Sequence, residues 1–498
     1  MMEKFSNAFP AFSGKTRFGK SRDERKGIGV KKFLSRAGWL ILFLAVLVVL
    51  YKGFDYLISD DTASQTRVSF HDYYKEDKLD YLFVGTSHIN QQISAVQLSK
   101  NLNKNVFNLS SAWQDFIGSY YLIREAINNH KTDRIILELS VSRLAIKETD
   151  ETAVFIITDY IKSPILRAQY LLSSFDMDGY VNAFLRLRRN IDPQDLPSAK
   201  ELTKLYREKQ EPEYTGYEGT DKYLGKGQWG VFRSWADEET GTAALNLKMG
   251  GLNNFGTDAI QDREVNYLRK IIELCKDNGI ELTFLMPTYS ELYLINFEHF
   301  EEVAQTFYDI AKEYNIPLID FNKVKKEYLD FGVADFHNSD HLNSYTSDRI
   351  SEFMTMYLQN PDGDYFYDTL EEKYPKTDDI IAVGYIPCFI TEKGEYPKAA
   401  DAEGDIETVR LDISALSWVK RPVKARIYVT EPLNKDEKEE GEKTVWLDKK
   451  EIKGEQLDAF TTQFVVPYNN LKTYYRVDLL DPETDEVLYE AFTRFDTK

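Results

Sequence analysis

The sequence predicts an α/β protein: a three-layer parallel sheet with helices on both faces, followed by an antiparallel β-sandwich and preceded by one transmembrane helix. Three patterns lead to this prediction. Apolar segments of strand length alternate with amphipathic helices in the centre of the chain, apolar and polar residues alternate from about residue 376, and one unbroken apolar run lies near the N-terminus.

The apolar run, Ala37–Tyr51, predicts a membrane anchor. As a helix it measures about 22 Å, short of the roughly 30 Å hydrocarbon core of a bilayer. Apolar neighbours on both sides, with Arg36 and Lys52 able to reach the headgroups, extend the expected anchor to residues 37–58. A cleaved signal peptide is the rival interpretation, but no small-residue cleavage motif follows the run.

Charge predicts the orientation of the anchor. The first 36 residues contain ten Lys or Arg against three Asp or Glu, an excess that places this tail in the cytoplasm and the rest of the chain on the opposite side. The whole chain has a formal charge of −19, so the exported part is acidic, which disfavours nucleic acid as a partner. Cys275 and Cys388 fall in different expected domains and argue against a disulfide framework.

The central segment predicts a parallel sheet because its strands are apolar throughout. Strands are expected at 81–85, 105–109, 134–139, 282–287 and 317–321, with helices at 117–129, 262–278 and 297–314. The ligand site of such a sheet lies beyond the carboxyl ends of its strands. Residues 59–78 are expected to form a short stalk between the anchor and the first strand.

The domain organisation follows from these patterns. The expected parts are a basic tail at 1–36, the anchor at 37–58, an α/β domain at 59–375 and a β-sandwich at 376–498. Residues 145–255 interrupt the α/β rhythm and are expected to form an insertion over the strand ends, either a substrate wall or packing without a role in binding. Sandwich strands are expected at 409–413, 425–430, 444–447, 462–466, 474–480 and 486–492.

Polar residues follow the expected strands of the parallel sheet. In chain order they are Gly85-Thr-Ser-His88, then Ser110, Ser111 and Gln114, then Ser140, then Thr288. The densest polar cluster, Asp335–Asn343, follows the last strand. Because the carboxyl ends of parallel strands share one edge of a sheet, these side chains are expected to converge there.

The pairing of Gly85-Thr-Ser-His88 with the late His341-Leu-Asn343 resembles the SGNH/GDSL hydrolase superfamily, over about residues 78–360. The resemblance is greatest to membrane-anchored bacterial members concerned with D-alanyl-lipoteichoic acid and with exopolysaccharide acetylation. It implies a flavodoxin-like sheet, a serine nucleophile that corresponds to Ser87, and a histidine base that corresponds to His341. A serine hydroxyl needs such a base to become a nucleophile at neutral pH.

Two positions depart from the family pattern. The acidic residue expected three positions before the histidine is Asn338 here, and Asp340 or Asp335 are its candidate substitutes. The asparagine that the family places after its third strand is Ser140. Both departures weaken the expectation of activity more than the expectation of fold.

An acyl transfer at Ser87 also needs fixed donors for the oxyanion. The expected donors are the backbone N–H of Ser87 and groups around Ser111 and Gln114. An alternative for Ser87 is a purely structural role as the N-cap of the following helix, a position that serine favours.

The predicted function is a surface-anchored serine esterase or O-acyltransferase that acts on acyl groups of a cell-envelope polysaccharide or teichoic acid. No cofactor is expected, and a transferase with one span would need a multi-pass membrane partner to deliver the acyl group. One alternative is a catalytically weak protein of the same fold that binds polymer or scaffolds an export complex. Another is a zinc hydrolase that uses His337 and His341 with Asp335 or Asp340.

Overall fold

The computed structural model describes residues 22–58, 64–175, 177–184, 197–211, 219–235, 246–248, 255–432, 445–468 and 474–495. The chain divides into two compact units. One unit contains Met1–Asp60 and Leu185–Tyr214, and the other contains Asp61–Phe184 and Thr215–Lys498. The polypeptide therefore passes from one unit to the other three times.

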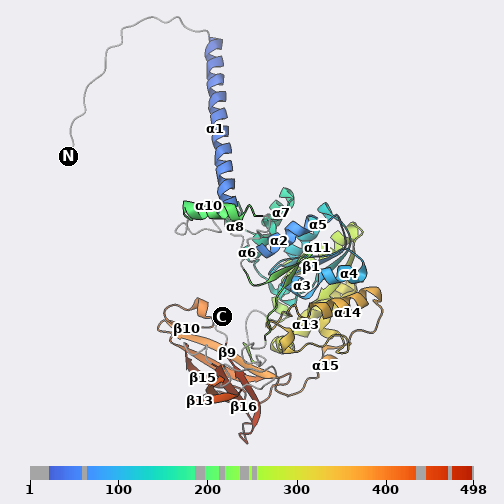
Figure 1. Cartoon of the computed structure of the whole chain (residues 1–498), viewed down its shortest axis with the longest axis vertical. Coiled ribbons are helices and arrows are strands. Elements are labelled where there is room, and N and C mark those ends of the chain that lie inside the picture. The colour runs from blue at the N-terminus through green and yellow to red at the C-terminus, as the bar shows by residue number, and fades with distance from the viewer. Residues whose placement is uncertain are drawn as a thin grey trace, which may run out of the picture. The chain divides into compact units, whose positions relative to one another are not determined.

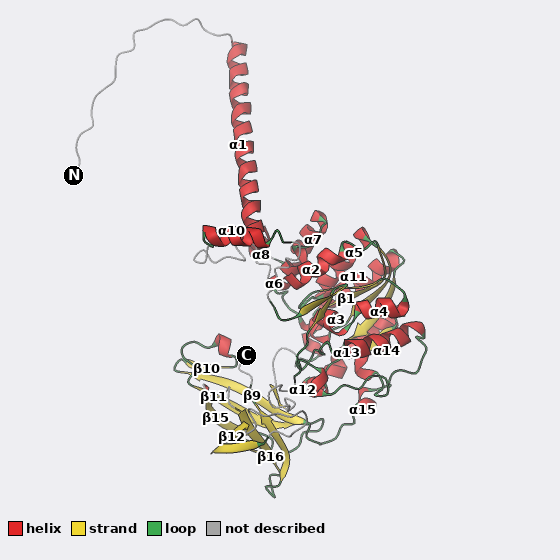
Figure 2. Ribbon diagram, viewed as in Figure 1, coloured by secondary structure: helices red, strands yellow, loops and turns green. Residues whose placement is uncertain are grey.

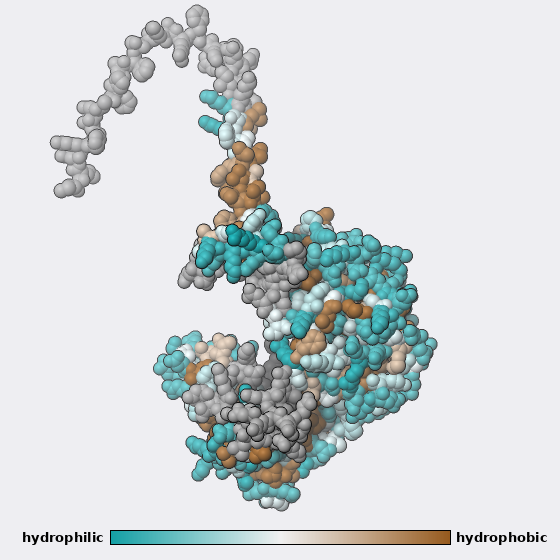
Figure 3. All heavy atoms as spheres, viewed as in Figure 1, coloured by the Kyte–Doolittle hydropathy of each residue, from teal (hydrophilic) through white to brown (hydrophobic). Residues whose placement is uncertain are grey.

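The first unit contains the long helix α1 (Arg22–Ile58) and the short helix α10 (Ala199–Glu208). Among the described residues, the segment Lys32–Leu57 of α1 is the one helix long and apolar enough to cross a membrane. Its apolar side chains lie on the surface, as the brown atoms along α1 show (Figure 3). The predicted anchor at 37–58 lies within α1, while residues 1–21 of the basic tail lie outside the described residues.

A five-stranded parallel sheet forms the centre of the second unit. Its strands are β1 (Lys78–Gly85), β2 (Val106–Ser110), β3 (Lys131–Glu138), β7 (Glu281–Met286) and β8 (Leu318–Asp320). They lie in the order β2-β1-β3-β7-β8, so all five predicted strands are confirmed. The order reverses between β1 and β3, because the chain goes outward to β2 and then returns to the far side of β1. The crevice at such a reversal is the usual ligand site of this fold.

Helices cover both faces of this sheet (Figure 2). The helices of this unit are α2 (Ser64–Tyr73), α3 (Ser87–Gln92), α4 (Ala95–Leu102), α5 (Phe116–Asn129), α6 (Glu151–Thr158), α7 (Pro164–Ser174), α8 (Met177–Phe184), α11 (Asp262–Asp277), α12 (Glu291–Asn296), α13 (Phe300–Tyr314), α14 (Ser347–Gln359) and α15 (Leu370–Lys373). Successive strand residues point to opposite faces. Leu82 therefore packs with α2, α5, α11 and α13, whereas Phe83 packs with α3, α4 and α14.

Part of the expected stalk is not a stalk. Residues 64–73 of that segment form α2, whose Phe70 and Tyr73 are buried in the main apolar cluster. The helix spans fewer than three turns, so its apolar residues recur too few times to show a helical period in the sequence. Residues 59–63 lie outside the described residues.

The insertion contributes a β-hairpin that covers the edge of the parallel sheet. The hairpin consists of β4 (Lys222–Gly225) and β5 (Gln228–Gly230). The backbone N–H of Asn108 in β2 donates to the Lys226 carbonyl at 3.0 Å. Trp229 is buried, and its indole Nε1 donates to Ser69 Oγ at 3.0 Å. The hairpin thus protects an edge strand that would otherwise expose unpaired backbone groups.

The C-terminal strands form two antiparallel sheets around a common apolar core (Figure 1). One contains β9 (Ala382–Thr391), β10 (Gly394–Tyr396), β11 (Thr408–Leu416), β14 (Glu455–Gln456) and β15 (Thr462–Pro467), and the insertion adds β6 (Asn246–Lys248), parallel to β9. The other contains β12 (Lys424–Pro432), β13 (Trp446–Ile452), β16 (Tyr474–Leu480) and β17 (Val487–Thr493). The sequence did not predict β9, because Gly384 and Pro387 within it argue against a strand.

The turn of the β4–β5 hairpin predicts a stability difference between two glycines. Gly225 and Gly227 have φ values of +99° and +77°, which cost an L-residue about 1–2 kcal/mol. A Cβ at Gly227 would also overlap the Asn108 carbonyl oxygen, whereas at Gly225 it would lie 3.5 Å from Val96 Cγ2. Gly227→Ala should therefore lower the Tm of the detergent-solubilised protein clearly more than the matched Gly225→Ala. Equal shifts would contradict the close approach of the hairpin to β2.

Candidate active site

The segment after β1 places Ser87 at the start of helix α3. Thr86, not Ser87, is the N-cap of this helix, and its hydroxyl accepts a hydrogen bond from the backbone N–H of His88 at 3.3 Å. The alternative prediction, that Ser87 is the N-cap of this helix, is therefore wrong. The Ser87 side chain is left partly exposed at the carboxyl edge of the sheet, next to the reversal between β1 and β3.

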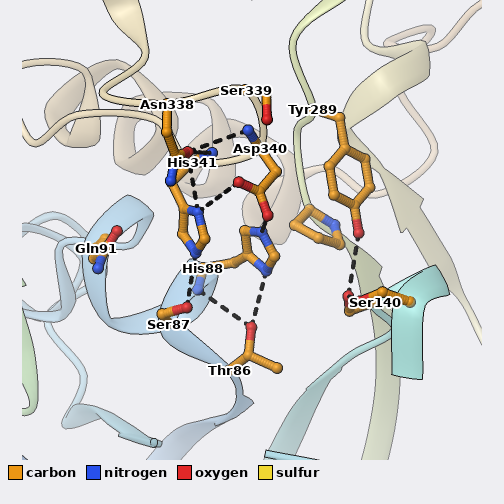
Figure 4. A network of polar contacts seen from close by, with 12 residues as sticks. Thr86, Ser87, His88, Gln91, Ser140, Tyr289, Asn338, Ser339, Asp340 and His341 are labelled. Carbon is orange, nitrogen blue, oxygen red and sulfur yellow. Dashed lines mark hydrogen bonds and ion pairs between the residues drawn. The ribbon is translucent and has the colours of Figure 1, made fainter. Parts of the chain in front are cut away.

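Ser87 and His341 meet, although 254 positions separate them in the chain. The distance from Ser87 Oγ to His341 Nε2 is 2.7 Å (Figure 4). On the other side of the ring, His341 Nδ1 lies 3.0 Å from Asp340 Oδ1 and 3.2 Å from Asn338 Oδ1. The three side chains Ser87, His341 and Asp340 thus form a nucleophile–base–acid arrangement, the geometry of a serine hydrolase triad.

Asn338 serves mainly to shape the loop. Its Oδ1 accepts hydrogen bonds from the backbone N–H groups of Asp340 at 3.2 Å and His341 at 2.8 Å. This side-chain-to-backbone turn is typical of asparagine. The turn directs the carboxylate of Asp340 at the imidazole of the next residue, His341. The family pattern instead places the acidic residue three positions before the histidine.

The two aspartates proposed as substitutes behave differently. Asp335 faces away from His341 and pairs with Arg349 Nη1 at 3.1 Å and with the Gly332 backbone N–H at 2.8 Å. Asp340 faces the imidazoles. Burial raises the pKa of Asp340, but the His341 and His88 rings and a backbone donor outweigh this effect and hold that pKa below its ordinary value. Asp340 is therefore ionised at neutral pH, as the acid partner of a triad has to be.

The loop that carries His341 is fixed from two directions. After β7, the hydroxyl and the backbone N–H of Ser290 both donate to the Ser339 carbonyl, at 2.5 and 3.3 Å. From the insertion, Trp235 N donates to the Phe336 carbonyl at 2.6 Å, and Val231 exchanges two hydrogen bonds with Ser344. The insertion segment at 231–235 thus holds the loop that carries His341 in place. This contact does not decide whether the insertion as a whole is a substrate wall or packing without a role in binding.

A buried carboxylate that the sequence analysis missed lies beneath the site. Glu138, at the end of β3, accepts hydrogen bonds from Thr86 N at 2.5 Å, from Thr86 Oγ1 at 2.8 Å and from His88 Nδ1 at 2.9 Å. Burial raises the pKa of Glu138, but His88 and the Thr86 donors outweigh it and leave the pKa below its ordinary value. A lone charged residue in an apolar strand was the available signal, since such a residue is almost never buried without a partner.

His88 lies between this carboxylate and the triad. Its ring stacks on that of His341 with 4.3 Å between centroids and 15° between planes. Its Nε2 is 3.9 Å from Asp340 Oδ2, while its Nδ1 is held by Glu138. His88 therefore lies between Glu138 and Asp340 and forms one wall of the site; its ring beside Asp340 and His341 is visible in Figure 4.

The ring of His337 stacks on that of His341, with 5.4 Å between centroids, but its Nε2 points to another partner. Its Nε2 lies 2.8 Å from Gln91 Oε1, and burial together with His341 and Arg233 lowers its pKa to about 3. The ring is therefore neutral at physiological pH. This pairing does not match the zinc set that combines His337 with His341.

The ligand atoms that do converge belong to His88, Asp340 and His341, which lie within 4.8 Å of one another. A cation bound by these three residues would have to replace the His341 bond to Ser87 or to Asp340, whereas His88 could offer its Nε2 and keep its Nδ1 on Glu138. Zinc at this place and a serine triad are therefore mutually exclusive uses of the same side chains.

Of the expected oxyanion donors, the groups around Ser111 and Gln114 already have partners in the fold. The Ser111 backbone N–H donates to the Gly85 carbonyl at 3.3 Å, and the Ser111 hydroxyl donates to Gln114 Oε1 at 3.2 Å. Gln114 Nε2 donates to Ser119 Oγ at 2.9 Å. Ser140, at the position of the missing asparagine, has its hydroxyl 3.3 Å from the Tyr289 hydroxyl.

No family model matches this chain, and no curated protein matches it. Among solved structures, it is similar to the crystal structure of a Bacteroides fragilis protein described as a candidate acylhydrolase, with 9% identity and a TM-score of 0.28. That match covers 59% of this chain and 95% of the other. A similarity at this level carries no argument, so the function proposed below depends on the geometry of the site.

The buried Glu138 predicts a pH-dependent stability. A carboxyl group with a lowered native pKa stabilises the fold above its unfolded-state pKa of about 4.3, and this contribution is lost as the pH falls. Glu138→Gln should cost about 1–3 kcal/mol near pH 7, because it removes the charged acceptor of three buried hydrogen bonds. The measured Tm difference from the unmodified protein should shrink as the pH falls below about 4.3.

Glu281→Gln is the matched control. Glu281 lies on the neighbouring strand β7 and pairs with Arg134, but its side chain is 68% exposed. Exposed pairs contribute about 0–1 kcal/mol. A Glu138 variant no less stable than this control would contradict the role assigned to the buried carboxylate.

Proposed function

We propose that this protein is a membrane-anchored serine esterase or O-acyltransferase that acts outside the cytoplasm on acyl groups of a cell-envelope polysaccharide or teichoic acid. The observation that carries the proposal is the 2.7 Å contact between Ser87 Oγ and His341 Nε2, with the ionised Asp340 behind the imidazole. Hydrogen-bond distance between nucleophile and base is the first requirement of this chemistry.

The reaction would begin with attack of Ser87 Oγ on the carbonyl carbon of an ester. His341 Nε2 accepts the serine proton as the C–O bond forms, and it then returns that proton to the departing alcohol as the ester bond breaks. The product of this half is an acyl ester on Ser87. A water molecule or a sugar hydroxyl, deprotonated by His341, next attacks the acyl group and releases Ser87.

Asp340 would perform the role that the family assigns to an acidic residue at the position of Asn338. Its carboxylate accepts the Nδ1–H of His341, which fixes the tautomer with Nε2 free to take a proton. It also stabilises the imidazolium that forms during each transfer. Asn338 could not supply that charge, but its turn sets the position of Asp340.

His88 and Glu138 would act as positioning residues. Neither touches the attacking oxygen, but His88 stacks on the base and Glu138 holds both Thr86 and His88, the two neighbours of Ser87 in the chain. Side chains that support the reacting groups in this way limit their freedom to leave a productive geometry.

The proposed oxyanion donors are the Ser87 backbone N–H and groups near Gln114. A side-chain amide has two N–H donors, and the contact of Gln114 Nε2 with Ser119 engages one of them. The absence of the family asparagine at Ser140 makes this donor set smaller than the usual one.

Labelling with a fluorophosphonate probe tests the proposed nucleophile. The unmodified protein should be labelled covalently at Ser87, and Ser87→Ala should abolish the labelling. Asp340→Asn should slow it strongly, because loss of the triad carboxylate costs about 10⁴-fold in kcat in the best studied case. Asp335→Asn, the matched control on the same loop, should label at nearly the normal rate.

Three other results are informative. Equal labelling rates for the two aspartate variants would contradict the role of Asp340. A folded protein that is not labelled, yet binds cell-wall polymer, would favour the alternative of a catalytically weak scaffold. An activity that requires stoichiometric zinc and disappears with a chelator would replace the triad with the metal site at His88, Asp340 and His341.

The membrane orientation has its own test. The basic residues before the apolar part of α1 support an N-terminus in the cytoplasm and the second unit on the other side. An alkaline phosphatase fused after Lys498 should be active in intact cells, since this reporter folds only outside the reducing cytoplasm. An inactive phosphatase fusion, with an active cytoplasmic reporter at the same place, would reverse the proposed orientation.

A further inference from the structure

Helix α10 in the insertion is amphipathic, and its apolar side is only partly covered in the described part of the chain, with Leu202 and Leu205 half-buried. Its apolar residues share one side of the helix, at the spacing of i, i+3, i+6 and i+7: Ala199, Leu202, Leu205 and Tyr206. No residue of α10 is buried, and the apolar clusters of the described residues include none of its side chains. Tyr206 is 53% exposed.

The helix is nevertheless well formed. Ser198 and Glu201 make a complete capping box at its N-terminus, with Ser198 N donating to Glu201 Oε2 at 2.7 Å and Glu201 N donating to Ser198 Oγ at 3.3 Å. A ten-residue helix is marginal in water without a surface on which to place its apolar side. Some surface beyond the described residues should therefore cover that side.

The place of α10 indicates what that surface is. The helix belongs to the same compact unit as α1 and lies across the C-terminal end of α1 (Figure 1). Lys209 Nζ donates to the Tyr56 carbonyl at 2.8 Å, and Gln210 Nε2 donates to the Tyr56 hydroxyl at 3.1 Å. Tyr56 is next to the last residue of the apolar span Lys32–Leu57. Tyrosine at the end of a span marks the boundary between lipid and water.

We propose that α10 is an in-plane membrane helix that lies at the bilayer surface where α1 emerges. The inference depends on the proposed membrane location of α1. The apolar side of α10 would enter the headgroup boundary by about 5–10 Å, as interfacial helices do. Helix and span together would then form one membrane-bound body.

The charges of α10 suit this position. Lys200, Lys204, Arg207 and Lys209 outnumber Glu201 and Glu208, in a chain that is strongly acidic overall. Five of these six charges lie on the side opposite the apolar residues, and Lys209 beyond the helix contacts Tyr56. A local excess of basic residues beside an apolar stripe favours a surface that carries anionic lipids.

Depth-dependent quenching in vesicles tests the inference. The full-length protein with Cys388→Ser would be reconstituted in phosphatidylcholine–phosphatidylglycerol vesicles, since Cys275 is buried and burial raises its pKa to about 12. An environment-sensitive fluorophore would be attached at Leu205→Cys on the apolar side or at Lys204→Cys on the charged side. Leu47→Cys in the middle of the span is the control for the anchor, and the unlabelled background corrects for Cys275.

We expect blue-shifted emission and strong quenching by spin-labelled lipids at position 205, and weak quenching at position 204. Strong quenching at 47 but equal, weak quenching at 204 and 205 would overturn the inference and leave the anchor intact. A blue shift at 205 without lipid quenching would also overturn it, because the helix would then cover protein. Absence of quenching at 47 would instead reject the proposed anchor.

Discussion

The position of Ser87 depends on the buried carboxylate of Glu138. This single group accepts hydrogen bonds from the backbone and the hydroxyl of Thr86 and from the ring of His88, the residues on either side of Ser87. The arrangement requires a glycine at the end of β1, because a Cβ at Gly85 would overlap Glu138. The Gly85-Thr-Ser-His88 segment therefore has a structural role as well as carrying Ser87: through Glu138 it connects the end of β1 to the end of β3.

The second half of the site is built by different means. Several hydrogen bonds hold the loop around His341: Asn338 makes a local turn, Ser290 binds Ser339 from the end of β7, and backbone hydrogen bonds from the 231–235 segment flank the loop. The two parts of the site are therefore held by different interactions: hydrogen bonds to a buried carboxylate beside Ser87, and hydrogen bonds among part-exposed groups around His341.

The sequence predicted the parallel sheet, most of the sandwich and the pair Ser87 and His341, because continuous apolar strands and polar strand ends are local patterns. It left the acid open between Asn338, Asp340 and Asp335, since loop conformation decides which oxygen faces the ring. It missed Glu138, because the hydrogen-bond partners of this residue, Thr86 and His88, come from a distant part of the chain. It also missed β9, because Gly384 and Pro387 are unusual in a strand that pairing with β11 nevertheless stabilises. Each failure concerns information that lies in tertiary contacts and not in residue spacing.

With α1 as the proposed membrane anchor, the three passages of the chain between the two units would affect how proteolysis could release the protein. A single proteolytic cut in residues 59–63 would break the chain between α1 and α2. Helix α10 would remain covalently linked to the second unit on both of its sides. Release would then also require Lys209 and Gln210 to leave Tyr56. If α1 is the proposed anchor, a protein attached in this way would stay at the membrane after a cut that frees a domain held by a simple stalk.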